Sequence, residues 1–185
     1  MAEKRWRRLT EAEIEMARKV FSDGIDYARV KIWCGIPFLP FVKAAVSPNG
    51  WIFFPKASFC DDFSCQDPSY QSWLIHELTH VWQYQQGFKT WFGGLVLSCQ
   101  GGYIQRRAYH YPKPEEIRSF GSLNMEQQAD VVAHYFGERF LSAKPQPQRL
   151  AEFERILSVF SYHPHNRNLL PSYWKRIGKA VKTER

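Results

Sequence analysis

The sequence of 185 residues predicts an α+β fold, in which a small antiparallel sheet is followed by packed helices. Two observations on pattern lead to this class. Residues 25–56 contain runs that alternate between apolar and polar residues around a turn sequence, which is typical of strands. The segments on both sides have apolar residues at helical spacing. The length suits one domain with a sizeable core, so residues 1–185 are assigned to a single domain.

The composition is that of a globular protein. Hydrophobic residues make up 44% and aromatic residues 16%, which provides enough apolar surface for a core. The net charge is +7, and its densest run is residues 3–8. This charge indicates a basic, solvated surface that suits anionic partners. No nucleic-acid-binding signature accompanies the charge, so a specific nucleic-acid partner is not expected.

Cysteine usage and targeting signals give further expectations. Cys60 and Cys65 can close a small loop in an oxidising compartment, but the four cysteines include no CxxC pair and reduced thiols are the default expectation. The basic N-terminus is not followed by an apolar run, so we expect no signal peptide and a cytoplasmic chain as synthesised. The longest apolar stretch, residues 91–104, is too short and too rich in glycine for a membrane span.

The N-terminal part predicts one helix and a sheet. Thr10 and Glu13 form a capping box in front of apolar residues at helical spacing. Residues 25–33 alternate as a strand does, and the runs 41–46 and 51–55 flank the sequence SPNG. That sequence supplies the turn chemistry of a hairpin. We therefore expect a small antiparallel sheet in this part of the chain.

The remainder is expected to be mostly helical. Residues 67–68 (Asp-Pro) are suited to begin a helix that runs to Gly87. Residues 88–108 are interrupted by glycines and are expected to be helical in part. Another helix is expected from about Asn124, and a helical C-terminal extension over residues 147–182 is expected to contain two helices, residues 149–160 and 171–181.

The sequence HELTH, residues 76–80, is the most informative motif. His76 and His80 lie four residues apart, so on a helix both imidazoles project from one face and can bind one metal ion. Glu77 lies about 100° around the helix, within reach of a water on that metal. Bound zinc lowers the pKa of such a water to about 7. The motif predicts a hydrolytic Zn²⁺ centre with Glu77 as general base, and the alternative is two histidines hydrogen-bonded in a core.

A catalytic zinc site needs three protein ligands and an open position. Gln83 and Gln86, which follow on the same helix, supply no further ligand. Glu126 and Asp130 lie four apart on the later predicted helix and share a face. We expect Glu126 to bind the metal and Asp130 to accept a hydrogen bond from a ligand histidine, with His76 preferred. The other candidates for the third ligand are His110, Glu115, Glu116 and His134.

Together the two motifs resemble the gluzincin arrangement of thermolysin-like peptidases. One departure is that Met125 stands directly before Glu126, where thermolysin-like enzymes have asparagine. The resemblance implies these roles: metal ligands His76, His80 and Glu126, general base Glu77, and Asp130 behind a ligand histidine.

A wider resemblance spans roughly residues 9–140, the expected core of the domain. Segments within these residues resemble, in the same order, segments of bacterial zincin-like domains described as Vgr-related or Rhs-associated. Those domains are linked to polymorphic toxins and type VI secretion. The resemblance implies a zincin-like fold with the sheet packed on the active-site helix, and export by a type VI secretion system without a cleaved signal. The segments that carry it are residues 9–33, 44–55, 73–87 and 124–136.

The same resemblance implies how a substrate is held. The strand near residues 51–54 is expected to be the edge strand above the cleft, where an extended peptide pairs main chain to main chain, although an ordinary sheet strand fits the pattern equally well. Peptide hydrolysis also needs a hydrogen-bond donor for the developing oxyanion. His134, one turn beyond Asp130, is the preferred donor. The other eligible residues are Tyr103, His110, Tyr111 and Tyr135.

The sequence thus predicts a zinc metallopeptidase that acts on a peptide or protein substrate. One alternative is a non-catalytic zinc-binding adaptor or structural domain of a type VI or Rhs system. A second is an effector that cleaves peptidoglycan peptides, since the net positive charge suits an anionic wall polymer.

Overall fold

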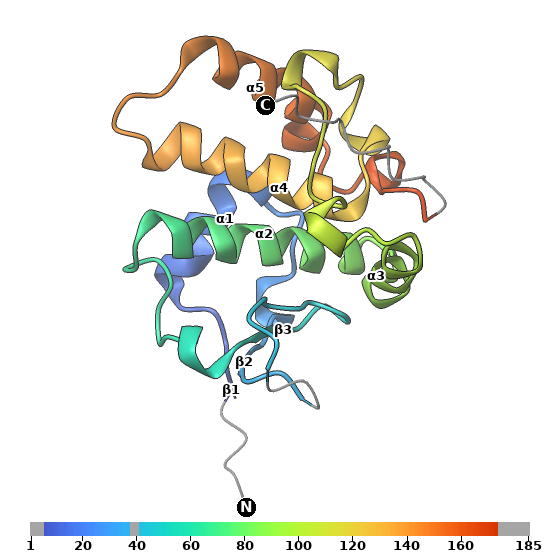
Figure 1. The fold of residues 1–185 in the computed structure, drawn as a ribbon. Coiled ribbons are helices and arrows are strands. Elements are labelled where there is room, and N and C mark those ends of the chain that lie inside the picture. The colour runs from blue at the N-terminus through green and yellow to red at the C-terminus, as the bar shows by residue number, and fades with distance from the viewer. Residues whose placement is uncertain (1–5, 38–40, 174–185) are drawn as a thin grey trace, which may run out of the picture.

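The computed structural model of the protein describes residues 6–37 and 41–173, and it confirms the α+β class with a small sheet and a mostly helical remainder. The strands lie at one end of the molecule, and α2 lies between them and α4 (Figure 1). The strands are β1 (Trp6–Arg7), β2 (Ile32–Cys34) and β3 (Ile52–Phe54). The α-helices of the described residues are α1 (Glu11–Phe21), α2 (Pro68–Gln85), α3 (Thr90–Cys99), α4 (Met125–Phe136) and α5 (Pro147–Tyr162).

The sheet differs from the expected antiparallel arrangement because it is mixed. β2 is the central strand, antiparallel to β1 and parallel to β3, with Trp33 opposite both Trp6 and Phe53. Alternation determines which face a residue occupies but not the direction of the partner strand, so the parallel pairing was not visible in the sequence. Residues 27–29 form a 3₁₀ turn instead of a strand.

The predicted hairpin around SPNG is reduced to one contact. Val46 forms an isolated antiparallel bridge with Phe53, with main-chain N–O distances of 3.0 and 3.1 Å. The rest of the described run 41–46 leaves the sheet and borders a cleft. β3 is the last strand of the sheet order β1-β2-β3, as expected for an edge strand, and its outer side carries the single bridge to Val46.

The helices begin where their capping residues predict. At α1, the Thr10 hydroxyl accepts from the Glu13 amide at 3.1 Å, and the Glu13 carboxylate accepts from the Thr10 amide at 2.9 Å. At α4, Asn124 and Gln127 form the same reciprocal pair at 2.8 and 3.1 Å. α2 ends two residues before Gly87, whose φ of +107° is a conformation that side chains disfavour.

The two central helices share the core. α2 packs more extensively against α4 than against any other element, and α5 covers another side of α4 (Figure 1). Ala129 and Ala133 have small side chains and are buried, which lets the helices approach closely. The predicted buried faces are confirmed: Leu74, Leu78, Val81 and Trp82 on α2, and Ala129, Val132, Ala133 and Phe136 on α4.

The remaining helical predictions have mixed outcomes. α3 confirms that residues 88–108 are helical in part, and α5 confirms the first half of the extension 147–182. The second helix expected there, residues 171–181, lies mostly outside the described residues. Among the described residues, no helix combines the length and the apolar character that crossing a membrane requires.

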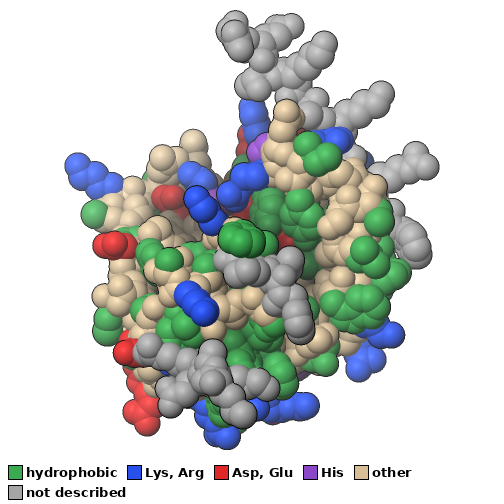
Figure 2. All heavy atoms as spheres, turned by 60° about the horizontal axis from the view of Figure 1, so that its bottom comes forward, with side chains coloured by type: hydrophobic (Ala, Val, Ile, Leu, Met, Phe, Trp, Pro, Cys, Tyr) green, Lys and Arg blue, Asp and Glu red, His purple; other side chains and the backbone are tan. Residues whose placement is uncertain are grey.

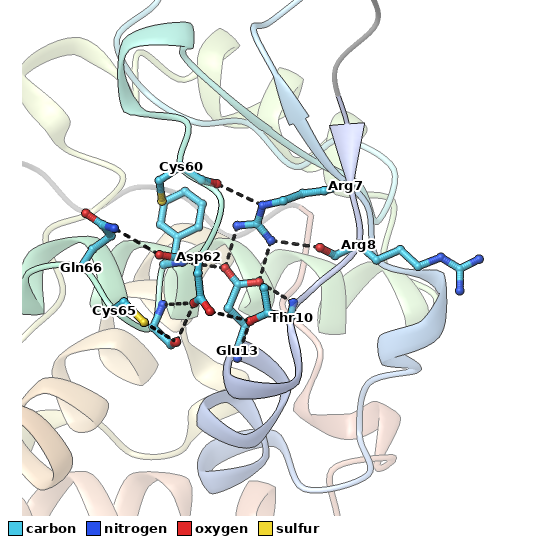
Figure 3. Close-up of polar contacts among 10 residues, drawn as sticks. Arg7, Arg8, Thr10, Glu13, Cys60, Asp62, Cys65 and Gln66 are labelled. Carbon is cyan, nitrogen blue, oxygen red and sulfur yellow. Dashed lines mark hydrogen bonds and ion pairs between the residues drawn. The ribbon is translucent and has the colours of Figure 1, made fainter.

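A buried ion pair ties the N-terminal strand to the helical body (Figure 3). The Arg7 guanidinium donates to both oxygens of Glu13 at 2.7 Å, and the Glu13 residue is fully buried. Glu13 also accepts from the Phe63 amide at 2.8 Å, and Arg7 Nε donates to the Cys60 carbonyl at 3.0 Å. One carboxylate thus connects β1, α1 and the segment before α2.

We expect Glu13→Ala to lower the free energy of unfolding by about 3 kcal/mol, because it leaves the Arg7 guanidinium and two main-chain amides without their shared acceptor. The matched control is Glu15→Ala, an exposed position on the same helix, with an expected change below about 0.5 kcal/mol. Urea unfolding followed by circular dichroism measures both. Equal changes in the two variants would contradict the role given to Glu13.

Candidate metal centre

α2 presents the two histidines of the motif toward a single point. The His76 and His80 side chains are 12% and 6% exposed, and their Nε2 atoms lie 3.2 Å apart. Most of the remaining helix is buried, with α4 on one side and β3 on the other. The helical spacing therefore places both imidazoles together, as the sequence predicts.

α4 brings a carboxylate to the same point. Glu126 lies in the first turn of the helix, two residues after the Asn124 cap, and its Oε2 is 3.4 Å from His76 Nε2 and 3.3 Å from His80 Nε2. Among the residues that the structure describes, His76, His80 and Glu126 are the one group of His, Cys, Asp and Glu side chains placed to hold a metal ion.

The hydrogen bonds behind the imidazoles determine which ring atoms face the carboxylate. His76 Nδ1 lies 2.9 Å from Asp130 Oδ1, the contact predicted for Asp130. His80 Nδ1 lies 2.9 Å from the side-chain oxygen of Gln83. Carboxylate and amide oxygens only accept hydrogen bonds, so both Nδ1 atoms carry hydrogen. The Nε2 atoms remain as the ring positions that can bind a metal.

The distances fit a tetrahedral metal ion. Ligand bonds of about 2.0–2.1 Å in a tetrahedral site place neighbouring ligand atoms about 3.3–3.4 Å apart. The three distances among His76 Nε2, His80 Nε2 and Glu126 Oε2 are 3.2, 3.3 and 3.4 Å. Glu126 Oε2 is also buried without a hydrogen-bond partner. Such an orphaned carboxylate oxygen is costly unless a cation satisfies it.

The charges of the cluster also call for a cation. Burial lowers the pKa of His76, but the Asp130 and Glu126 carboxylates beside it outweigh that effect and raise this pKa to about 10. Burial raises the pKa of Glu126, yet the neighbouring His80 and His76 hold it well below its usual range. A proton on an imidazole nitrogen and a metal ion both neutralise the same carboxylates, so they compete for the same position. Metal binding must therefore release protons, and the metal affinity is expected to rise with pH.

Glu77 is buried beside the cluster and is not one of its three converging residues. Its Oε2 accepts a hydrogen bond from the Ser47 hydroxyl at 2.7 Å. The Ser47 carbonyl in turn accepts from the Thr90 hydroxyl at 2.9 Å, which anchors this turn on α3. The sequence pointed to Ser47 only as part of a hairpin turn, so its contact with Glu77 was not predicted.

The segment after α3 covers the other side of the cluster. The Tyr103 hydroxyl donates to Glu126 Oε1 at 2.8 Å, and the Tyr109 ring stacks on His76 with 6.1 Å between ring centroids. Burial, and then the Glu126 carboxylate, raise the pKa of Tyr103 far above its ordinary value, so the phenol stays a protonated donor. Gln105 and Arg106 have positive φ angles of 50° and 57°, a strained conformation for side-chain-bearing residues at the edge of the site.

His134 lies in the cleft wall but contacts none of the three converging side chains directly. Its Nδ1 is 2.7 Å from the Tyr111 hydroxyl, and burial lowers the pKa of His134. The alternative ligands lie elsewhere: the His110 carbonyl accepts from Gln127, and Glu115 and Glu116 are exposed on a 3₁₀ turn. Tyr135 packs with its ring against Phe140.

A cleft of about 790 Å³ opens over the cluster. Viewed from the sheet end, the molecule shows Lys and Arg side chains beside a hollow edged by hydrophobic side chains (Figure 2). Two exposed cationic side chains, Lys43 and Arg106, line the cleft from opposite segments. Its other lining residues include Trp73, His76, Glu77, Tyr103, Tyr109, Asp130 and His134.

Comparison with known proteins identifies two related chains, while no protein-family model matches. The sequence is 33% identical over 141 residues to the type VI secretion system spike protein VgrG2b of Pseudomonas aeruginosa, a match that covers 72% of this chain and 13% of that protein. The structure matches the effector domain of Pseudomonas aeruginosa VgrG2b with a TM-score of 0.65 and 28% identity, covering 82% of each chain. The chain thus spans a small part of the length of VgrG2b, and its likeness in sequence and fold shows homology to the VgrG2b effector domain.

Proposed function

We propose that this chain is a zinc-dependent peptidase and acts as the effector part of a type VI secretion spike. The observation that carries the peptidase is the convergence of His76 Nε2, His80 Nε2 and Glu126 Oε2 at tetrahedral spacing below a cleft, with Glu77 beside them. The homology to the effector domain of VgrG2b, a type VI secretion spike protein, supports the link to secretion and export by that system.

The proposed chemistry assigns a role to each side chain. A bound zinc ion would act as a Lewis acid and lower the pKa of a water molecule to about 7. The buried Glu77 carboxylate would take up a proton at this position and return it to the leaving amine. The Ser47 hydroxyl donates a hydrogen bond to Glu77 Oε2 and so orients the carboxylate. Oε1 is then the oxygen that can accept and return the proton.

Tyr103 is the better-placed donor for the developing oxyanion. Its protonated hydroxyl already lies beside the ligand Glu126, at the cleft, and can turn from that carboxylate to a substrate carbonyl. The role predicted for His134 has less support, because its Nδ1 is paired with Tyr111 and it contacts no ligand.

Replacing the proposed base tests the mechanism most simply. Glu77→Gln removes the proton acceptor and leaves all three ligands, so we expect unchanged zinc stoichiometry and a 10²–10⁴-fold loss of peptide hydrolysis, an order-of-magnitude range. His76→Ala should lose both zinc and hydrolysis. Metal analysis and turnover of a broad peptide library measure the two properties, with the exposed Glu116→Gln as control.

Retained hydrolysis in Glu77→Gln would remove Glu77 as the base. Stoichiometric zinc in a wild-type protein that cleaves no peptide, with no effect of a chelator on any activity, would favour the non-catalytic adaptor instead.

The oxyanion donor is tested by comparing two single changes. Tyr103→Phe is expected to lower kcat by about 10²-fold with little change in KM, because the hydroxyl acts only in the transition state. His134→Gln is expected to lower kcat less than about threefold. The reverse order of effects would restore His134 as the donor.

The cleft charges favour a substrate with carboxylates near the scissile bond, which includes peptidoglycan peptides. Arg106→Gln should lower kcat/KM for acidic peptides by about fivefold, or about 1 kcal/mol, a magnitude typical of an exposed ion pair. Matched peptides with amides in place of carboxylates should be unaffected, and Arg118→Gln, exposed outside the cleft, serves as control. Equal losses on both peptide series would exclude this preference.

A further inference from the structure

Gln83 is a fully buried polar side chain that lies three residues after His80 on α2. Its side-chain oxygen is 2.9 Å from His80 Nδ1. Its side-chain nitrogen donates to the Met125 carbonyl at 3.1 Å and to Gln128 Oε1 at 2.9 Å. One amide thus contacts a metal-ligand candidate on α2 and the main chain directly before Glu126 on α4.

The surroundings fix the orientation of this amide. A main-chain carbonyl can only accept, so the group that faces Met125 must be the amide nitrogen, and the oxygen must face His80. The same argument applies to Gln128, the hydrogen-bond partner of Gln83. Gln128 Nε2 donates to the carbonyls of Phe120 at 3.0 Å and Leu169 at 2.8 Å, so its oxygen faces Gln83. Three main-chain carbonyls therefore determine the direction of both amides.

This direction has a consequence for His80. An amide oxygen cannot donate, so His80 Nδ1 must carry hydrogen to satisfy the contact. His80 Nε2 is then the ring atom that points at Glu126 Oε2, 3.3 Å away. His76 receives the equivalent support from the Asp130 carboxylate, whereas His80 receives it from a neutral group.

We infer that Gln83 is a positioning residue for the metal centre. It holds His80 in the form with hydrogen on Nδ1, and through the Met125 carbonyl it fixes the start of α4 that carries Glu126. Supporting groups behind metal-binding histidines commonly contribute 10–100-fold, an order-of-magnitude range, to metal affinity. The inference rests on the metal-binding half of the proposed function and is independent of peptidase activity.

Zinc affinity of purified, folded variants tests the inference by competition with a chromophoric chelator at fixed pH. Gln83→Met has similar volume but none of the three hydrogen bonds, and should bind zinc about 10–100-fold more weakly. Gln83→Glu keeps an acceptor oxygen for His80 Nδ1 but loses the donation to the Met125 carbonyl and Gln128, so it should recover part of that loss. Thr79→Val is the matched control, because it removes an equally buried polar group of α2 whose hydroxyl donates to the Ile75 carbonyl at 3.0 Å and not to the Gln83 network. Its zinc affinity should stay within about threefold of wild type, an expectation set against the same range.

Nitrogen-15 NMR of the zinc-loaded wild type supplies a second readout that needs no variant. It should place the His80 ring proton on Nδ1, and Gln83→Met should broaden or lose that signal. A proton on Nε2, wild-type affinity in Gln83→Met, or an equal loss in Thr79→Val would overturn the role of Gln83. If Gln83→Met does not fold, the Gln83→Glu and Thr79→Val affinities and the wild-type spectrum decide. No zinc binding by the wild type would overturn the proposed function as well, which distinguishes the two failures.

Discussion

The candidate centre depends on the close packing of α2 against α4. The two imidazoles belong to one helix and the carboxylate to the other, so their separation of 3.3–3.4 Å is set by how near the helices lie. Ala129 and Ala133 of α4 are small and buried, which allows the close approach, and Gln83 of α2 hydrogen-bonds to Met125 and Gln128 of α4. A larger side chain at either alanine would push Glu126 away from both rings before it touched the cluster itself.

The same packing explains why the site tolerates so much buried charge. Glu77, Glu126 and Asp130 each have a specific partner: the Ser47 hydroxyl, the Tyr103 hydroxyl and His76 Nδ1. One oxygen, Glu126 Oε2, is left with only the two Nε2 atoms beside it. A fold that buries such an atom loses stability there, and sites of this kind are usually retained for function.

Much of the site could be predicted from local spacing. His76, His80, Glu126 and Asp130 follow from two pairs of residues four apart on helices, since that interval fixes a shared face before any tertiary structure is known. The cap at Thr10 was equally predictable, because its hydrogen bonds join residues three apart, and the start of a helix near Asn124 was predicted without its cap. These features depend on the chain over one turn of helix.

What the sequence could not provide depends on contacts between distant segments. The contacts of Ser47 with Glu77 and of Gln83 with His80 were not predicted. Tyr103 was one of several eligible oxyanion donors, and its hydrogen bond to Glu126 depends on the path of the segment after α3. The sequence analysis noted only that Gln83 supplies no metal ligand. Its contacts with Met125 and Gln128 depend on how α2 packs on α4, which the sequence pattern does not reveal. The parallel pairing of β2 with β3 escaped for the same reason, since alternation carries no strand direction.

An anomalous difference map from crystals of the zinc-loaded protein, recorded on both sides of the zinc absorption edge, tests the central claim most directly. The account predicts one strong peak within bonding distance of His76 Nε2, His80 Nε2 and a Glu126 carboxylate oxygen. A zinc peak bound by other side chains, or none between these three, would contradict it.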